Sequence, residues 1–129
     1  MAYLLDAGTL AEVLRSVPSA NLVRRLTNVP SRDRWTSVIS VSQLLIAARK
    51  TQRPKLMQDV LSLVSGVKVA SFDVASAQAF AKFRATVAPQ GDPDDVMIAA
   101  IAVTNDFTLV TRRVADFTRF PNLRVESWV

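Results

Sequence analysis

One apolar stretch constrains this fold more than any other, because residues 96–103 read Val-Met-Ile-Ala-Ala-Ile-Ala-Val without a single charge. Asp92 is a typical N-cap ahead of it, and Pro93 suits the first helical position, where its missing N–H would have no intrahelical partner. Asp94 and Asp95 then fall in the first turn, where the helix dipole favours carboxylates. We predict a helix that is surrounded by protein nearly all round. Asp95 is either one more acid at a helix start or a metal ligand on a rigid element.

Short apolar runs alternate with helical patterns along the rest of the chain. The predicted strands cover residues 2–5, 35–40, 67–70, 107–111 and, as an edge strand, 123–128. The other predicted helices cover residues 9–16, 19–29, 41–50, 54–66 and 73–84. This alternation favours an α/β fold with a largely parallel sheet. A chain of 129 residues fits one domain, residues 1–129, with a single core.

The composition excludes several classes of active site. The chain has no histidine and no cysteine, which removes the usual general base, the thiol nucleophile and cysteine-bound zinc. With only 3 glycines, no glycine-rich phosphate loop can form. Hydrolytic chemistry would therefore depend on carboxylates and a hard divalent cation such as Mg²⁺ or Mn²⁺. The formal net charge of +5 is compatible with a polyanionic partner.

The N-terminal segment does not resemble a targeting signal. Asp6 interrupts the first apolar run too early for a signal peptide, and no apolar run reaches membrane-spanning length. We therefore expect a cytoplasmic protein without a membrane segment.

Polar residues follow the predicted strands and open the buried helix. Asp6 follows the first strand, Asp95 lies at the helix start, and Thr111, Arg113 and Asp116 follow the strand at 107–111. Each has a plain structural explanation, such as a helix cap, a strand end or a solvated loop acid. Ligands of parallel sheets bind beyond the carboxyl ends of the strands, so one pocket could gather all three acids. Two or three carboxylates are what Mg²⁺ requires for phosphoryl chemistry.

Four segments, in the same order, resemble the motifs of PIN-domain proteins. Residues 3–10 resemble the opening L-L-D-T-N-x-L motif, and residues 38–50 resemble the T-x-x-E-L … G-A-x-K segment. Residues 92–100 resemble G-P-x-D-x-x-I-A-A, and residues 109–128 resemble the ending L-V-T-x-N-x-x-D-F … P-x-L-x-V-E-x-W. The likeness spans essentially the whole chain and points to the VapC-type toxins of bacterial and archaeal toxin–antitoxin pairs.

The resemblance implies a PIN-like three-layer α/β/α sandwich with a mainly parallel central sheet. It also implies a homodimeric, Mg²⁺- or Mn²⁺-dependent endoribonuclease that a VapB-type antitoxin holds inactive. Asp6 and Asp95 would be metal ligands, Asp116 a supporting acid, Gln43 a weak ligand or substrate orienter, and Thr111 a hydrogen-bonding support. We expect the homodimer to be built partly on apolar helix faces at 44–48 and 56–64. We expect the antitoxin to lie in the acidic groove and to insert an arginine toward Asp6 and Asp95.

Three positions depart from the family pattern, and one of them is Ala7, which stands where the motif has threonine. Gln43 stands where the family has Glu, so it offers a carbonyl oxygen but no charge. Arg113 stands where the family has Asp or Asn. If Arg113 points inward it competes with a metal for the carboxylates, and if it points outward it can bind an RNA phosphate.

Three functional hypotheses follow. The first is a metal-dependent ribonuclease toxin that uses Asp6, Asp95, Asp116 and Gln43. The second is a catalytically silent PIN-like domain that binds RNA or an antitoxin without cleaving. The third, a receiver-like signalling module, is disfavoured because no acidic pair follows the first strand.

Overall fold

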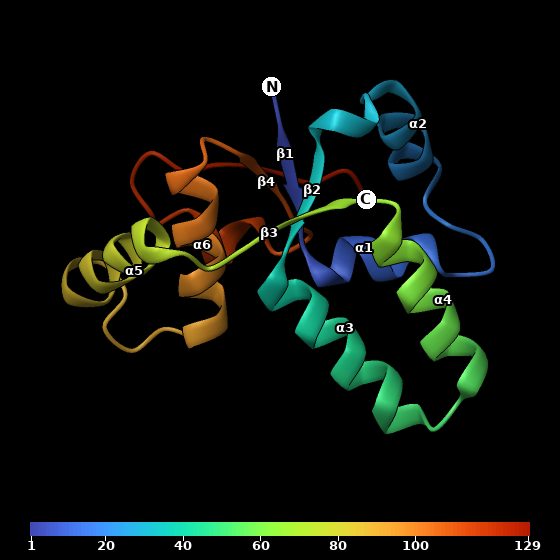
Figure 1. Ribbon diagram of the computed structural model, residues 1–129. Helices are drawn as coiled ribbons and strands as arrows, with labels where there is room; N and C mark the ends of the chain where they lie inside the picture. The colour runs from blue at the N-terminus through green and yellow to red at the C-terminus, as the bar shows by residue number, and fades with distance from the viewer.

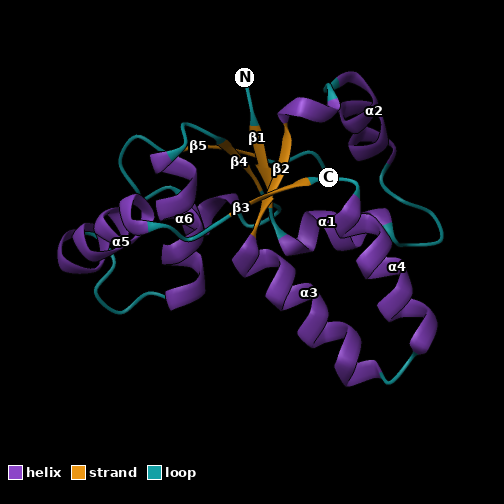
Figure 2. Cartoon of the chain, in the orientation of Figure 1, coloured by secondary structure: helices purple, strands orange, loops and turns teal.

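The computed structural model describes residues 1–129 and contains one sheet of five strands (Figures 1 and 2). The strands are β1 (Tyr3–Leu5), β2 (Arg34–Ser37), β3 (Lys68–Ala70), β4 (Thr108–Val110) and β5 (Arg124–Glu126). Their order across the sheet is β3-β2-β1-β4-β5, and every neighbouring pair is parallel. The predicted parallel sheet is therefore confirmed, with the last strand at one edge as expected.

Six α-helices and two short 3₁₀ segments connect these strands. The helices are α1 (Ala7–Val13), α2 (Ala20–Asn28), α3 (Val38–Thr51), α4 (Pro54–Ser65), α5 (Val74–Thr86) and α6 (Pro93–Thr104). The 3₁₀ segments are η1 (Ser31–Asp33) and η2 (Val114–Phe117). None of the helices combines the length and the apolar character that a membrane span requires.

The helices cover the two faces of the sheet, as Figure 1 shows, with α5 and α6 on one side and α1 to α4 on the other. Parallel connections are right-handed, so the path from β1 to β3 puts its helices on one face and the return to β4 puts them on the opposite face. Adjacent strand residues serve the two faces in turn: Leu4 and Leu109 pack in the α5–α6 core, whereas Leu5 and Val110 pack in the α1–α4 core. This confirms the three-layer α/β/α sandwich.

Helix α6 is the buried element that its sequence predicts. Asp92 is the N-cap, since its Oδ1 accepts a hydrogen bond from the backbone N–H of Asp94 at 2.9 Å, and Pro93 is the first helical residue. Val96 and all residues from Ile98 to Ala102 are buried. The helix ends before Asp106, whose positive φ of 56° provides the turn into β4.

The observed strands are shorter than predicted, and one prediction extended a strand into a helix. Residues 38–40 were expected to extend the strand at 35–40, but they form the first turn of α3. Ser37 is extended and its Oγ accepts a hydrogen bond from the backbone N–H of Ser40 at 2.9 Å, which starts a helix at Val38. The β-branched side chains of this segment favour a strand only locally, and the cap together with burial on a helix face overrides that preference.

The first predicted helix also starts earlier than expected, at Ala7 instead of residue 9. The reason is Asp6, whose Oδ1 accepts a hydrogen bond from the backbone N–H of Thr9 at 2.8 Å and caps α1. The helix ends at Val13, before the expected residue 16.

Candidate functional site

The candidate site lies at the carboxyl ends of β1, the central strand, and of its neighbour β4. The next strand after β1 lies on one side of this pair, and the next strand after β4 lies on the other side. The connections that leave these two strand ends therefore diverge, which is where parallel α/β sheets bind ligands. Asp6 directly follows β1, Thr111 directly follows β4, and the first turn of α6 supplies Asp95.

Asp6 is a buried carboxylate that also has a structural role. It is 5% exposed, and besides capping α1 it donates its backbone N–H to the carbonyl oxygen of Val110 at 3.1 Å. This bond joins the end of β1 to the end of β4. The position of Asp6 is thus fixed by both the sheet and the helix that it caps.

Asp95 is held by Arg113. The two terminal nitrogens of the guanidinium donate hydrogen bonds to Oδ2 and Oδ1 of Asp95 at 3.0 and 2.9 Å. The Asp95 side chain is 9% exposed and the Arg113 side chain is 49% exposed. The hydrogen bonds to Asp95 raise the pKa of Arg113, against the opposing effect of desolvation, and the charge of Asp6 raises it further. Arg113 therefore points inward and stays charged among the acids.

Asp116 and Thr111 hold the same arginine from outside the site. Asp116 is exposed on η2 and accepts a hydrogen bond from Arg113 at 3.1 Å. The hydroxyl of Thr111, a fully buried residue, accepts a hydrogen bond from the backbone N–H of Arg113 at 3.1 Å. The guanidinium also lies over the ring of Phe117, 5.5 Å from its centroid. Thr111 thus supports the loop that carries Arg113.

Gln43 on α3 reaches the start of α6, but its partner there is Asp94. Its Nε2 donates a hydrogen bond to Oδ2 of Asp94 at 3.1 Å. The sequence singled out Asp95 as the candidate ligand on this helix and took Asp94 only as a first-turn acid. A hydrogen bond between an amide and a carboxylate on distant elements leaves no pattern in the sequence. The Gln43–Asp94 pair could therefore not be predicted.

Two of the side chains predicted to bind a divalent metal ion, Asp95 and Gln43, are engaged by other groups, and this disfavours a bound ion in the resting site. Mg²⁺ takes oxygen ligands in near-octahedral geometry and is held through carboxylates. Both oxygens of Asp95 instead accept hydrogen bonds from a cation, and Gln43 is occupied by Asp94. No group of three His, Cys, Asp or Glu side chains is placed to hold a metal ion, so Asp6, Asp95 and Asp116 do not form the three-acid cluster that the sequence suggested.

A third buried acid, Glu12, lies on α1 and was not identified from the sequence. Its side chain is 2% exposed, receives ion pairs from Arg15 at 3.2 Å and Arg112 at 3.6 Å, and accepts a hydrogen bond from the backbone N–H of Ser19 at 3.1 Å. Burial raises the pKa of Glu12, but the hydrogen bonds from Arg15 and Ser19 and the two nearby charges outweigh it, so the pKa lies below its ordinary value. The Glu12–Arg15 spacing on a helix was the only sequence signal.

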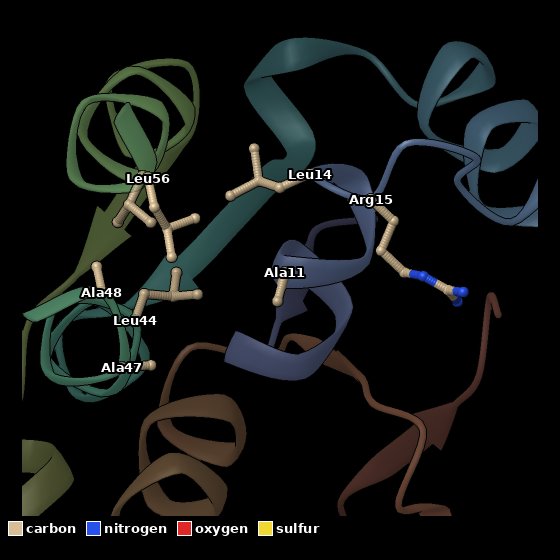
Figure 3. A pocket seen from close by; sticks show the side chains of 8 residues that line it. Ala11, Leu14, Arg15, Leu44, Ala47, Ala48 and Leu56 are labelled. Atoms are coloured by element: carbon tan, nitrogen blue, oxygen red, sulfur yellow. The ribbon is translucent and has the colours of Figure 1, made fainter. Parts of the chain in front are cut away.

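An apolar groove separate from the acids lies between α1, α3 and α4 (Figure 3). It has a volume of about 230 Å³ and is lined by Ala11, Leu14, Arg15, Leu44, Ala47, Ala48, Leu56 and Val60. Leu44 and Ala48, which were expected to supply surface for partners, are buried in the chain's own core and form the groove floor. The guanidinium of Arg15 points away from the groove in Figure 3.

Comparison with known proteins agrees with this fold along the whole chain. The PIN domain family matches residues 3–121. The chain is 29% identical over 132 residues to the tRNA(fMet)-specific endonuclease VapC of Shigella flexneri, covering 99% of this chain and 98% of that protein. It is 30% identical over 125 residues to the plasmid stability protein StbB of Pseudomonas syringae pv. tomato, covering 88% and 89% of the two chains.

A solved structure extends the agreement to three dimensions. The crystal structure of DNA-bound VapBC from Salmonella typhimurium contains a chain that is 26% identical and superposes with a TM-score of 0.89. The match covers 100% of this chain and 99% of that one. With its parallel sheet, its two helical layers and the family match over residues 3–121, this chain belongs to the PIN domain family.

Proposed function

We propose that this chain is the toxin of a VapBC-type toxin–antitoxin pair and that it acts on RNA as an endoribonuclease. The observation that carries the proposal is the placement of two buried carboxylates, Asp6 and Asp95, at the diverging strand ends of a PIN fold. The net charge of +5 supports an RNA substrate, because cations near the surface attract phosphates. The proposal places the chain in the cytoplasm, where RNA is available.

The groove between α1, α3 and α4 supports an antitoxin partner. Seven of its eight lining residues are hydrophobic, which suits the apolar face of a helix. We propose that a VapB-type antitoxin lays an amphipathic segment in this groove. Arg113 already donates to both oxygens of Asp95, so an antitoxin arginine directed at Asp6 and Asp95 would have to share or displace that contact.

Exposed apolar side chains support a homodimer. Ile46 on α3 and Leu61 on α4 are each 54% exposed, and Val74 at the start of α5 is 76% exposed. Light scattering at micromolar to high micromolar concentration tests this part of the proposal. A monomer across that range contradicts it.

Cleavage of RNA tests the proposed function. Mg²⁺ or Mn²⁺ is the cofactor expected from the family resemblance, so the assay contains Mn²⁺. Initiator tRNA is the first substrate to test, because two relatives carry that specificity in their names. Wild type should cleave it, whereas Asp6→Asn and Asp95→Asn should not. Cleavage that survives in both variants would place the activity elsewhere or in a contaminant.

A second candidate function is favoured by the Arg113–Asp95 contact. A PIN-like domain whose acids are neutralised from within could bind RNA or an antitoxin without cleaving. This candidate predicts that the wild type binds RNA or antitoxin but leaves RNA intact with Mn²⁺. The two candidate functions are therefore distinguished by one assay, in which RNA is incubated with the wild type and Mn²⁺ and is either cleaved or left intact.

A further inference from the structure

We infer that Arg113 is a built-in counter-cation, which takes the place of a divalent metal ion on Asp95 and weakens the affinity of the resting site for Mg²⁺ and Mn²⁺. The inference concerns the site of the proposed ribonuclease and rests on that function only for its consequence for cleavage. Its direct consequence is a property of the chain alone, the affinity for a divalent ion.

The geometry of the contact is that of a complete ion pair. Both Asp95 oxygens accept from Arg113, at 3.0 and 2.9 Å, so neither is left without a positive partner. A parallel two-bond contact of this kind is stronger and more directional than a contact to one oxygen. An incoming metal ion must share these oxygens with the guanidinium or displace one of its bonds.

The arginine is held in this place by more than Asp95. Asp116 accepts a hydrogen bond from it at 3.1 Å, the ring of Phe117 lies beneath it, and Thr111 fixes its backbone N–H. Phe117 is fully buried, so the ring offers a fixed surface. Arg113 is therefore positioned by the chain around it, and it is not a free surface arginine that happens to reach an acid.

The charge of the site points the same way. Asp6 and Asp95 are the two buried carboxylates at the strand ends, and Arg113 offsets one of their two negative charges. The residue that replaces the family's third acid, Gln43, brings no charge and is hydrogen-bonded to Asp94. Because the guanidinium lowers the summed charge of this pair from two negative charges to one, it weakens the attraction of the two carboxylates for a divalent cation.

The test measures Mn²⁺ binding to the full chain by calorimetry and by electron paramagnetic resonance, for the wild type and Arg113→Asn. Removing the guanidinium should tighten Mn²⁺ binding at least tenfold, which corresponds to about 1.4 kcal/mol. Arg113→Lys keeps the charge without the two-bond geometry and should fall between the two. It also serves as the second variant if Arg113→Asn does not fold, in which case it must still bind Mn²⁺ more tightly than the wild type.

Two controls define what the result means. Arg112 is the neighbouring arginine with a 54% exposed side chain, and it pairs with Glu12 instead of Asp95. Arg112→Asn removes the same charge and should leave Mn²⁺ affinity unchanged. Asp95→Asn combined with Arg113→Asn should lose the gained affinity. Equal Mn²⁺ affinity of the wild type and Arg113→Asn, or an equal gain in Arg112→Asn, overturns the inference.

The RNA assay is read separately from metal binding. If Arg113→Asn binds Mn²⁺ more tightly but neither this variant nor the wild type cuts RNA, the inference stands and the proposed ribonuclease function fails. If the wild type cuts RNA and Arg113→Asn binds Mn²⁺ no better, the function stands and the inference fails.

Discussion

The guanidinium of Arg113 spans both carboxylate oxygens of Asp95, at 3.0 and 2.9 Å, and joins a half-exposed cation to a buried acid. These residues lie 18 positions apart, on the loop after β4 and the first turn of α6. The contact lies beyond the carboxyl end of β4 and ties that loop to the start of α6. It satisfies Asp95, whose burial would otherwise be costly, and the same bonds occupy the oxygens that a metal ion would need.

Truncation of the arginine should destabilise the fold. Arg113→Ala leaves Asp95 without its partner, and an unsatisfied buried polar group costs about 1–3 kcal/mol. We expect about 1 kcal/mol, the low end of that range, because water can reach the place of a half-exposed guanidinium. Urea unfolding measures the change. Arg24→Ala, which removes an arginine bonded only to its helix neighbour Asn21, is the control, and equal stability of the two variants would contradict the expectation.

Restoring the family's glutamate should not by itself restore a metal site. Gln43→Glu removes the donor that now bonds Asp94 and sets two carboxylates against each other, which costs about 1 kcal/mol in water-like surroundings. Combined with Arg113→Asn, the same change adds a carboxylate to a site without the competing cation. The fold-increase in Mn²⁺ affinity of the double variant over the wild type should therefore exceed the product of the fold-changes of the two single variants. Strict additivity in calorimetric titrations would show that the two residues do not share a site.

The cap of α3 should carry a measurable part of the stability. Ser37→Ala removes the hydroxyl that accepts from the Ser40 N–H, and the buried Ser40 hydroxyl loses its 3.0 Å partner. Loss of an N-cap costs about 0.5–2 kcal/mol, and we expect a value above 1 kcal/mol because both serines are buried. Ser42→Ala, an exposed serine of the same helix, should change the free energy of unfolding by less than about 0.5 kcal/mol. Equal effects of the two substitutions would contradict the role of the cap.

Glu12 should make stability depend on pH in the acidic range. Its pKa in the folded chain lies below the ordinary value of 4.5, so the stability that it contributes is present above pH 4.5 and is lost as the pH falls through the folded pKa. Thermal unfolding of the wild type should therefore shift to lower temperature below pH 4.5 more steeply than that of Glu12→Gln. Asp59→Asn, an acid paired only with the exposed Lys55, should keep the wild-type slope. Identical pH profiles of wild type and Glu12→Gln would refute the assignment.

A charge in the groove should block the antitoxin without harming the fold. Ala11 is exposed on α1 and lines the groove, so Ala11→Asp places a carboxylate on the surface that the apolar helix face would cover. We expect co-purification with a co-expressed VapB-type antitoxin to be lost, while circular dichroism and the unfolding midpoint change little. Thr27→Asp, on the exposed part of α2, is the matched control. Unchanged co-purification of Ala11→Asp would show that the partner binds elsewhere.

Local chemistry made much of the fold predictable from the sequence. Asp92 and Pro93 mark the start of α6. The uncharged run that follows favours burial in any fold, and it is buried in this one. The alternation of apolar strands and helical patterns implies parallel connections, and right-handed crossovers then leave few arrangements. These features depend on neighbours within one or two turns, which is why the sequence alone determines them.

Residues 38–40 mark where that local information ends. Their β-branched side chains favour a strand, but Ser37 caps a helix there, and the helix is stable because its inner face packs against the core of α1 and α4. The choice between the two conformations depends on packing with segments far along the chain, which a local pattern does not contain.

The candidate site divides in the same way. The sequence by itself placed Asp6 and Asp95 at a strand end and a helix start, because each position follows from its own element. Only the tertiary structure decided that Arg113 turns inward to Asp95, that Gln43 takes Asp94, and that Glu12 is buried between Arg15 and Arg112. Long side chains can reach several partners at nearly equal cost, and the partner is fixed only when the sheet brings distant strand ends to one edge.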